Sequence, residues 1–184
     1  MRTWMIVVLL IGVCALAADR PASVPQYTTR GELIRPEGYR VWVFVGSSLG
    51  MSYSEGSGEK NPEFANIYLK PESYRQFLST GKFPDHTLLV MERTTSASQA
   101  SINRQGRFED QILGIEVAVK DQKRFPGKWA YFSFIGPGGK ALAQAKPFPQ
   151  ESCWSCHHAH GAVDNVFVQF YPLLRQAHSD PPAR

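Results

Sequence analysis

Cysteine is scarce in this chain, which has only three among its 184 residues: Cys14, Cys153 and Cys156. A zinc site built from four cysteines is therefore excluded. Cys14 lies in an N-terminal apolar segment that we expect to be removed, so Cys153 and Cys156 are the only thiols expected in the mature chain. Both belong to one short motif, and no cysteine is left for a structural disulfide elsewhere.

Runs of one charge and internal repeats are also missing. Lys and Arg number 20 against 16 Asp and Glu, a formal net charge of +4 that is spread along the chain. Without a basic run, the sequence gives no support to nucleic-acid binding, and only a mild attraction to an acidic redox partner or an anionic surface follows. No long apolar run follows the N-terminus, so we expect no membrane span in the mature chain.

Residues 1–17 are typical of a secretory signal peptide, with Arg2 before an apolar core and an Ala-Leu-Ala site that predicts cleavage before Ala18. The apolar stretch is shorter than the roughly 20 residues of a membrane-spanning helix. Lipid attachment at Cys14 is less favoured, because Val13 is too large for that cleavage. We therefore expect an exported, periplasmic protein whose remaining length corresponds to one domain.

The motif is Cys153-Trp154-Ser155-Cys156-His157, the Cys-x-x-Cys-His signature of covalent c-type haem attachment. Each thiol would form a thioether with the haem, and His157 would be the proximal ligand of the iron. The alternatives are a redox dithiol, half of a zinc site and a disulfide. A thioredoxin-like pair would lie early in the domain, at the start of a helix, whereas this motif lies near the C-terminus. We expect one haem c per chain.

The pattern along the chain predicts an α+β fold with an antiparallel β-sheet and a few helices, the haem being attached near the C-terminus. Residues 71–80 are expected to form a helix, because Pro71 suits its first position and Gly81 its end. In residues 111–119 the odd-numbered positions should form the apolar face of a strand. The other expected segments are an extended lead-in at 18–37; strands at 39–45 (or a buried helix), 66–69, 87–92 and 129–135; loops at 46–62, 94–107 and 140–151; a helix at 166–176; and a disordered tail at 177–184.

Several short segments follow one another in a definite order, before and after the haem motif, within the haem domain expected at residues 38–176. They are Tyr-Arg-Val-Trp-Val at 39–43, Asn-Ile-Tyr-Leu at 66–69 before Pro-Glu-Ser-Tyr at 71–74, Gly-Lys-Phe-Pro-Asp at 81–85, Gly-Ile-Glu-Val-Ala-Val-Lys-Asp at 114–121, Trp-Ala-Tyr-Phe-Ser-Phe at 129–134 and Val-Phe-Val-Gln-Phe-Tyr-Pro at 166–172. Together with the motif they resemble the cytochrome P-460 family, which includes the cytochromes c′-beta. The resemblance implies a β-rich, often dimeric domain with one five-coordinate haem c. It also implies either hydroxylamine oxidation or the binding of nitric oxide or carbon monoxide in an aromatic-capped pocket.

The sequence departs from this family at one informative place. Catalytic members carry a lysine that is covalently joined to the haem ring, and the resemblance places Met91 at the position of that lysine. A thioether cannot form the nitrogen–carbon bond. Lys70 and Lys120 are the rival lysines. Met91 itself is expected to be either core filler or, less favoured, a sixth ligand of the iron.

Candidates for the ligand side of the haem are Phe44 and Phe64, which would cap the iron with apolar rings. An apolar cap favours neutral diatomic gases over charged ligands. Glu92, Glu116 and Arg40 would supply acid–base chemistry if they pointed inward, although solvated strand faces are the simpler interpretation.

Near the motif, Asp164 would accept a hydrogen bond from the ring of His157 or cap a helix. His158 and His160 are expected at the surface or the haem edge, and His86 in a solvated turn.

Three hypotheses follow. The first is an exported mono-haem protein that binds nitric oxide or a similar small ligand at five-coordinate iron. The second is a hydroxylamine-oxidising enzyme with a lysine cross-link from elsewhere, and the third is an electron-transfer cytochrome with a sixth ligand such as Met91. A redox partner protein and a homodimer are further expectations.

Overall fold

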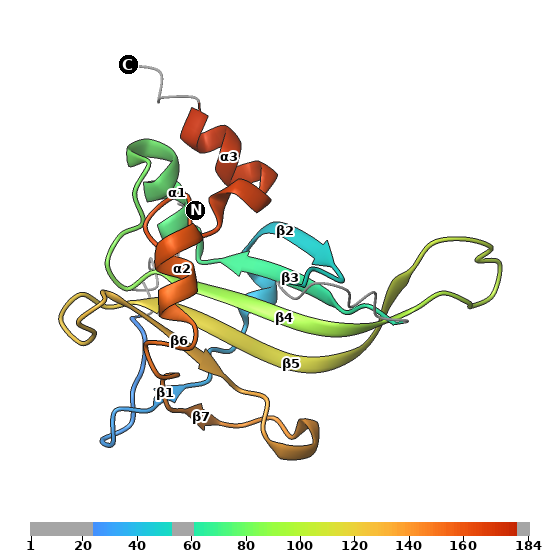
Figure 1. The fold of residues 1–184 in the computed structure, drawn as a ribbon, viewed down its shortest axis with the longest axis horizontal. Coiled ribbons are helices and arrows are strands. Elements are labelled where there is room, and N and C mark those ends of the chain that lie inside the picture. Colours follow the sequence, from blue (N-terminus) through green and yellow to red (C-terminus); the bar gives the residue numbers. More distant parts are fainter. Residues whose placement is uncertain (1–23, 53–60, 180–184) are drawn as a thin grey trace, which may run out of the picture.

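In the computed structural model, which describes residues 24–52 and 61–179, an antiparallel five-stranded sheet has the order β2–β3–β4–β5–β6 (Figure 1). Its strands are β2 (Val43–Leu49), β3 (Phe64–Leu69), β4 (Leu88–Ala97), β5 (Phe108–Lys120) and β6 (Trp129–Ser133). The predicted signal peptide and residues 180–184 of the predicted tail lie outside the described residues. Sheet and helices together confirm the α+β class.

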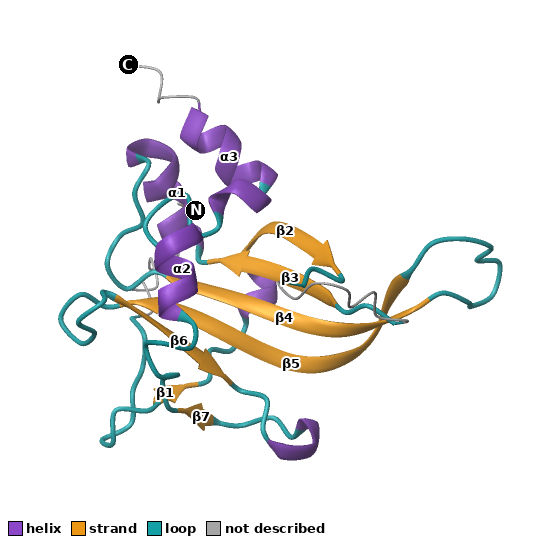
Figure 2. Cartoon of the chain, viewed as in Figure 1, coloured by secondary structure: helices purple, strands orange, loops and turns teal. Residues whose placement is uncertain are grey.

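Helices α1 (Pro71–Thr80), α2 (Trp154–His160) and α3 (Pro172–Ser179) lie on one face of the sheet (Figure 2). On the other side lies a two-stranded sheet of β1 (Leu33–Ile34) and β7 (Gln144–Ala145). Short 3₁₀ turns complete the described elements: η1 (Tyr39–Val41), η2 (Pro137–Gly139) and η3 (Val168–Phe170). No helix in the described part of the chain is long and apolar enough to span a membrane.

Two hydrophobic cores lie on the two faces of the sheet, because strand side chains alternate. Ile115, Val117 and Val119 of β5 are buried in the core that faces β1 and β7, which confirms the predicted apolar face. Leu113 is only half-buried and Gln111 is exposed, since this end of β5 belongs to a hairpin with β4 that projects beyond the sheet (Figure 1). The second core lies under the helices.

Helix α1 has the predicted bounds. Gly81 ends it in the left-handed conformation, φ 67°, and its N–H donates to the carbonyl oxygen of Phe77. Phe77 is fully buried in the helix-side core, where it stacks on Phe83 with ring centroids 4.3 Å apart. The signals at the two ends of the helix were thus sufficient to predict its bounds.

Several other predicted segments were wrong in extent. Residues 39–41 form η1, so the strand predicted at 39–45 starts at Val43, and β2 then continues to Leu49 into the predicted loop. Pairing with β3, across a bulge between Phe44 and Gly46, overrides the loop propensity of its Gly and Ser residues. Strand β4 continues to Ala97, and the predicted loop 140–151 contains β7.

The final predicted helix, 166–176, is divided at Pro172. Pro172 is the first residue of α3, a position where its missing N–H costs nothing, and η3 precedes it. The backbone of α3 continues to Ser179, so the first three residues of the predicted disordered tail are helical.

Candidate functional site

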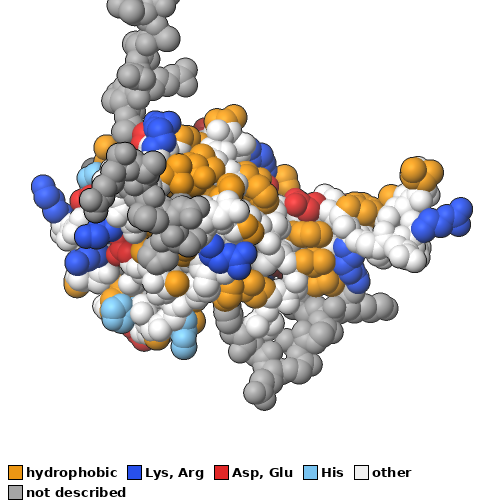
Figure 3. Space-filling view, turned by 90° about the horizontal axis from the view of Figure 1, so that it is seen from above, with side chains coloured by type: hydrophobic (Ala, Val, Ile, Leu, Met, Phe, Trp, Pro, Cys, Tyr) orange, Lys and Arg blue, Asp and Glu red, His pale blue; other side chains and the backbone are white. Residues whose placement is uncertain are grey.

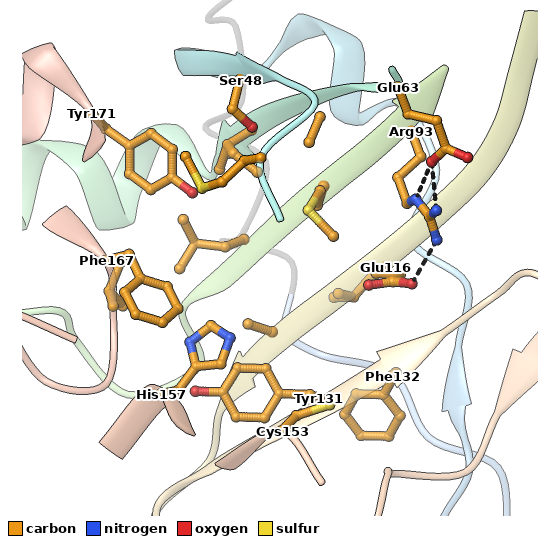
Figure 4. A pocket seen from close by; sticks show the side chains of 18 of the residues that line it. Ser48, Glu63, Arg93, Glu116, Tyr131, Phe132, Cys153, His157, Phe167 and Tyr171 are labelled. Carbon is orange, nitrogen blue, oxygen red and sulfur yellow. Dashed lines mark hydrogen bonds and ion pairs between the residues drawn. The ribbon is translucent and has the colours of Figure 1, made fainter. Parts of the chain in front are cut away.

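A cavity of about 440 Å³ lies between the helix-side face of the sheet and the segments that contain α2 and η3 (Figure 4). Strands β3 to β6 form its floor, and Tyr171, just before α3, contributes to its lining. The volume lies within the range of about 300–1,000 Å³ that is common for small-molecule and cofactor sites.

The haem motif lies at one end of this cavity. Cys153 immediately precedes α2 and is half-buried in the cavity wall, whereas Cys156 is exposed, and both are free thiols. Burial raises the pKa of the Cys153 thiol, and the nearby Glu116 carboxylate adds to this effect. Helix α2 is held against the turn between β5 and β6, because the indole N–H of Trp154 donates to the carbonyl of Gly127 at 2.9 Å.

The ring of His157 lies in the cavity wall between two aromatic rings (Figure 4). Ring centroids are 4.2 Å apart to Tyr131 and 4.5 Å to Phe167. Nδ1 lies 3.0 Å from the carbonyl oxygen of Asn165, which assigns the proton to Nδ1 and leaves Nε2 as the atom with a lone pair. Burial lowers the pKa of His157, although the hydrogen bond to Asn165 opposes this, so the neutral form is favoured. A neutral imidazole with a fixed tautomer is the form that ligates iron.

These residues fit a c-type haem. One short segment supplies two free thiols and an oriented neutral imidazole at a cavity of suitable size. When bound, haem would supply an iron centre that coordinates a small ligand.

A charged cluster forms part of the cavity wall away from His157 (Figure 4). The guanidinium of Arg93 donates to Glu63 (Nε–Oε2 2.9 Å) and to Glu116 (Nη1–Oε1 3.4 Å). Of the three acid–base candidates, only Glu116 faces the cavity. Glu92 is buried on the opposite face, where it accepts hydrogen bonds from Tyr39 and Arg40, so its predicted solvated position was wrong.

Of the two residues predicted to cap the iron, Phe64 lines the cavity and Phe44 does not. Phe44 is 48% exposed and packs against Tyr68, with ring centroids 5.7 Å apart. Met91, predicted to be core filler or a sixth ligand, also lines the cavity. Strand alternation places Tyr68 with the opposite core. The aromatic residues that line the cavity and that sequence reasoning missed are Tyr131, Phe132, Phe148, Phe167 and Tyr171.

No lysine lines the cavity within the described residues. Lys70 is 5% exposed at the start of α1, where burial lowers its pKa. Lys120 is also buried, and its ammonium donates to the carbonyl of Phe83 at 2.7 Å and to Asp164. Neither rival lysine lines the cavity.

Around the motif, the surface positions predicted for His158 and His160 are confirmed, and His158 stacks on Trp154 with ring centroids 4.4 Å apart. Both roles predicted for Asp164 were wrong: the acceptor for His157 is the backbone carbonyl of Asn165, and Asp164 is not a cap residue of α2 or η3. A pair of consecutive residues that favour the left-handed conformation, Asp164-Asn165, was the signal in the sequence for a tight turn there.

A second group of polar residues lies outside the cavity, where Asp85, His86 and Asp121 have potential ligand atoms within 4.8 Å of one another. The carboxylates of this group already accept hydrogen bonds from the backbone N–H groups of Gln122 and Arg124. They stabilise the turn after β5. His86 is 43% exposed, in partial agreement with its predicted solvated turn.

Comparison with models of protein families gives a match. The family model described as cytochrome P460 matches residues 36–168, which span the large sheet, the cavity and the Cys-x-x-Cys-His motif. A search of curated proteins found no match.

Proposed function

Because this chain belongs to the cytochrome P460 family, we propose that it is an exported mono-haem c-type protein whose five-coordinate iron binds nitric oxide or a similar small ligand. Cys153 and Cys156 would hold the haem, and His157 would be its proximal ligand. The observation that carries this proposal is the position of the His157 ring in the cavity wall, where the carbonyl of Asn165 orients it within the motif that contains both thiols. Residues 1–17 would direct export to the periplasm.

An open sixth position is favoured by the residues that line the cavity. Apart from His157, the described lining contains no histidine and no lysine. Met51 and Met91 are its two thioethers. Thioether ligation by Met91 would make the protein an electron-transfer cytochrome instead.

Hydroxylamine oxidation is the second candidate, and the Glu63–Arg93–Glu116 cluster favours it. Carboxylate oxygens accept hydrogen bonds, which a polar N–H or O–H ligand can donate and nitric oxide cannot. The lack of a lysine in the described cavity lining weighs against a covalent cross-link to the ring. We therefore rank ligand binding above oxidation.

Absorption spectroscopy of protein matured with haem, in both oxidation states and with and without nitric oxide, tests the proposal. We expect a high-spin ferric spectrum, an ordinary haem c Soret band in the ferrous state and a change on adding nitric oxide. The mass should equal that of the mature chain plus one haem.

Two outcomes would redirect the assignment. A low-spin ferric spectrum that is lost in Met91→Ala would establish the electron carrier, whereas a strongly red-shifted ferrous band would indicate a cross-link and the oxidase. Leu89→Ala, a substitution of a neighbouring cavity residue that has no ligand atom, is the matched control for Met91→Ala.

Two partner proposals accompany this function. The family resemblance implies a homodimer, which light scattering would test directly. A redox partner protein would reduce the haem. On the face seen in Figure 3, Lys and Arg side chains lie at several separate places.

A further inference from the structure

Asp164 and Asn165 form a tight turn in which both residues have left-handed backbone conformations, φ 49° and φ 62°. The turn connects Val163 and Val166, which exchange two backbone hydrogen bonds of 3.3 Å and 2.8 Å. Left-handed conformations cost free energy in residues other than glycine, although Asp and Asn tolerate them best. Something in the surroundings must therefore stabilise this pair.

The turn presents one carbonyl group to the proximal side of the cavity. The oxygen of Asn165 accepts from Nδ1 of His157 at 3.0 Å and from the hydroxyl of Tyr131 at 3.3 Å. Its direction depends on the backbone dihedral angles of Asp164 and Asn165. The orientation of the imidazole and the strength of its hydrogen bond are thus coupled to the geometry of the turn.

Two buried residues from the edge of the sheet hold the turn in place. The carboxylate of Asp164 accepts hydrogen bonds from the ammonium of Lys120 and, at 3.2 Å, from the indole N–H of Trp129. Lys120 ends β5 and Trp129 begins β6, and the two are partners in the strand register. They are 8% and 3% exposed, and Lys120 is fixed further by the carbonyl of Phe83.

Stability alone is a weak reason for such an arrangement, because a buried ion pair is often matched by apolar residues of similar volume. Its geometry has a more specific consequence. It connects the paired ends of β5 and β6 to the single carbonyl that orients His157.

We infer that Lys120 and Trp129, acting through Asp164, are positioning residues that set the donor strength of His157 toward iron. This inference rests on the proposed function, in which His157 is the proximal ligand. A hydrogen bond from the second ring nitrogen makes a histidine a stronger ligand, so loosening the turn weakens the ligand.

The test uses two variants. Asp164→Asn keeps an acceptor oxygen but removes the charge, and Lys120→Met keeps an unbranched side chain of similar length but removes the ammonium. The readouts are the iron–histidine stretching band of the ferrous protein and its reduction potential. Both variants should lower the band frequency and raise the potential, because a weaker donor stabilises ferric iron less. In the double variant, the band and the potential should shift no further than in either single variant, because both substitutions disrupt the same contact between Lys120 and Asp164.

Lys123→Met is the matched control, because Lys123 is exposed in the following turn and should leave both readouts unchanged. Trp129→Phe is a second probe that removes only the indole N–H and should shift both readouts in the same direction. Unchanged bands and potentials in haem-containing Lys120→Met and Trp129→Phe would overturn the inference. A wild-type protein that carries no haem would instead overturn the proposed function.

Discussion

Substitution of Gly127 should directly displace helix α2, which contains Trp154, Cys156 and His157. A Cβ atom at this position would lie 2.3 Å from Nε1 and 2.6 Å from Cε2 of Trp154. Ordinary contacts begin near 3.4 Å, so in Gly127→Ala the indole must retreat by roughly 1 Å. The backbone of Gly127 is not left-handed, and this clash is therefore the only local objection to alanine.

The cost can be worked from the two contacts that change. Overpacking costs about 1–3 kcal/mol, and the lost hydrogen bond from Trp154 to the Gly127 carbonyl costs about 1 kcal/mol. The lower backbone entropy of the unfolded alanine variant returns about 0.4–1 kcal/mol. We expect a net loss of about 2 kcal/mol, which in a chain of this length lowers Tm by roughly 4–8 °C.

A double-mutant cycle with Trp154→Ala isolates the clash. Without the indole, Gly127→Ala should stabilise the protein by about 0.4–1 kcal/mol, so the sign of its effect reverses. Urea unfolding followed by circular dichroism gives the free energies of the four proteins. Equal destabilisation by Gly127→Ala in both backgrounds would refute the reasoning.

Two further predictions concern buried charges outside the cavity. Burial lowers the pKa of Lys70 from its ordinary value of 10.5, so the charged form is penalised at every pH below its folded pKa. Lys70→Met should therefore raise Tm at neutral pH, with a gain that shrinks toward pH 10.5; a gain that does not depend on pH would contradict this. Glu92→Gln should cost about 1–3 kcal/mol in urea unfolding, because the carboxylate is the buried acceptor for both Tyr39 and Arg40. A loss below 0.5 kcal/mol, the level of an ordinary surface substitution, would show that the amide replaces the carboxylate.

Sequence reasoning succeeded where the signal was local. Helix α1 has its first residue at Pro71 and its C-cap at Gly81, as capping rules require. The family identified from ordered short segments is also confirmed. In each case residues close in the sequence carry the information, and no long-range pairing has to be known.

The rest depended on contacts between distant segments. Phe44 and Phe64 look equivalent in the sequence, but alternation and the bulge in β2 place Phe44 on the opposite side of the sheet from the cavity. Arg93 meets Glu63 and Glu116 only because β4 lies beside both β3 and β5 in one particular register. Polar residues in an expected strand or loop do not reveal such pairings, since the register is a property of the whole sheet.

The position of helix α2 depends on distant contacts as well. Helix α2 has seven residues and buries none of them fully, although Trp154 packs against the helix-side core, so the intrinsic stability of this short helix cannot fix it. Its contacts come from the edge of the sheet that β5 and β6 form. The indole of Trp154 donates to the carbonyl of Gly127, and the ring of His157 lies against the ring of Tyr131. The carbonyl of Asn165 accepts from His157, and Lys120 and Trp129 hold the turn that contains Asn165. The position of His157 in the cavity wall therefore depends on this sheet edge, so the cavity and the ring of His157 belong to one structural unit.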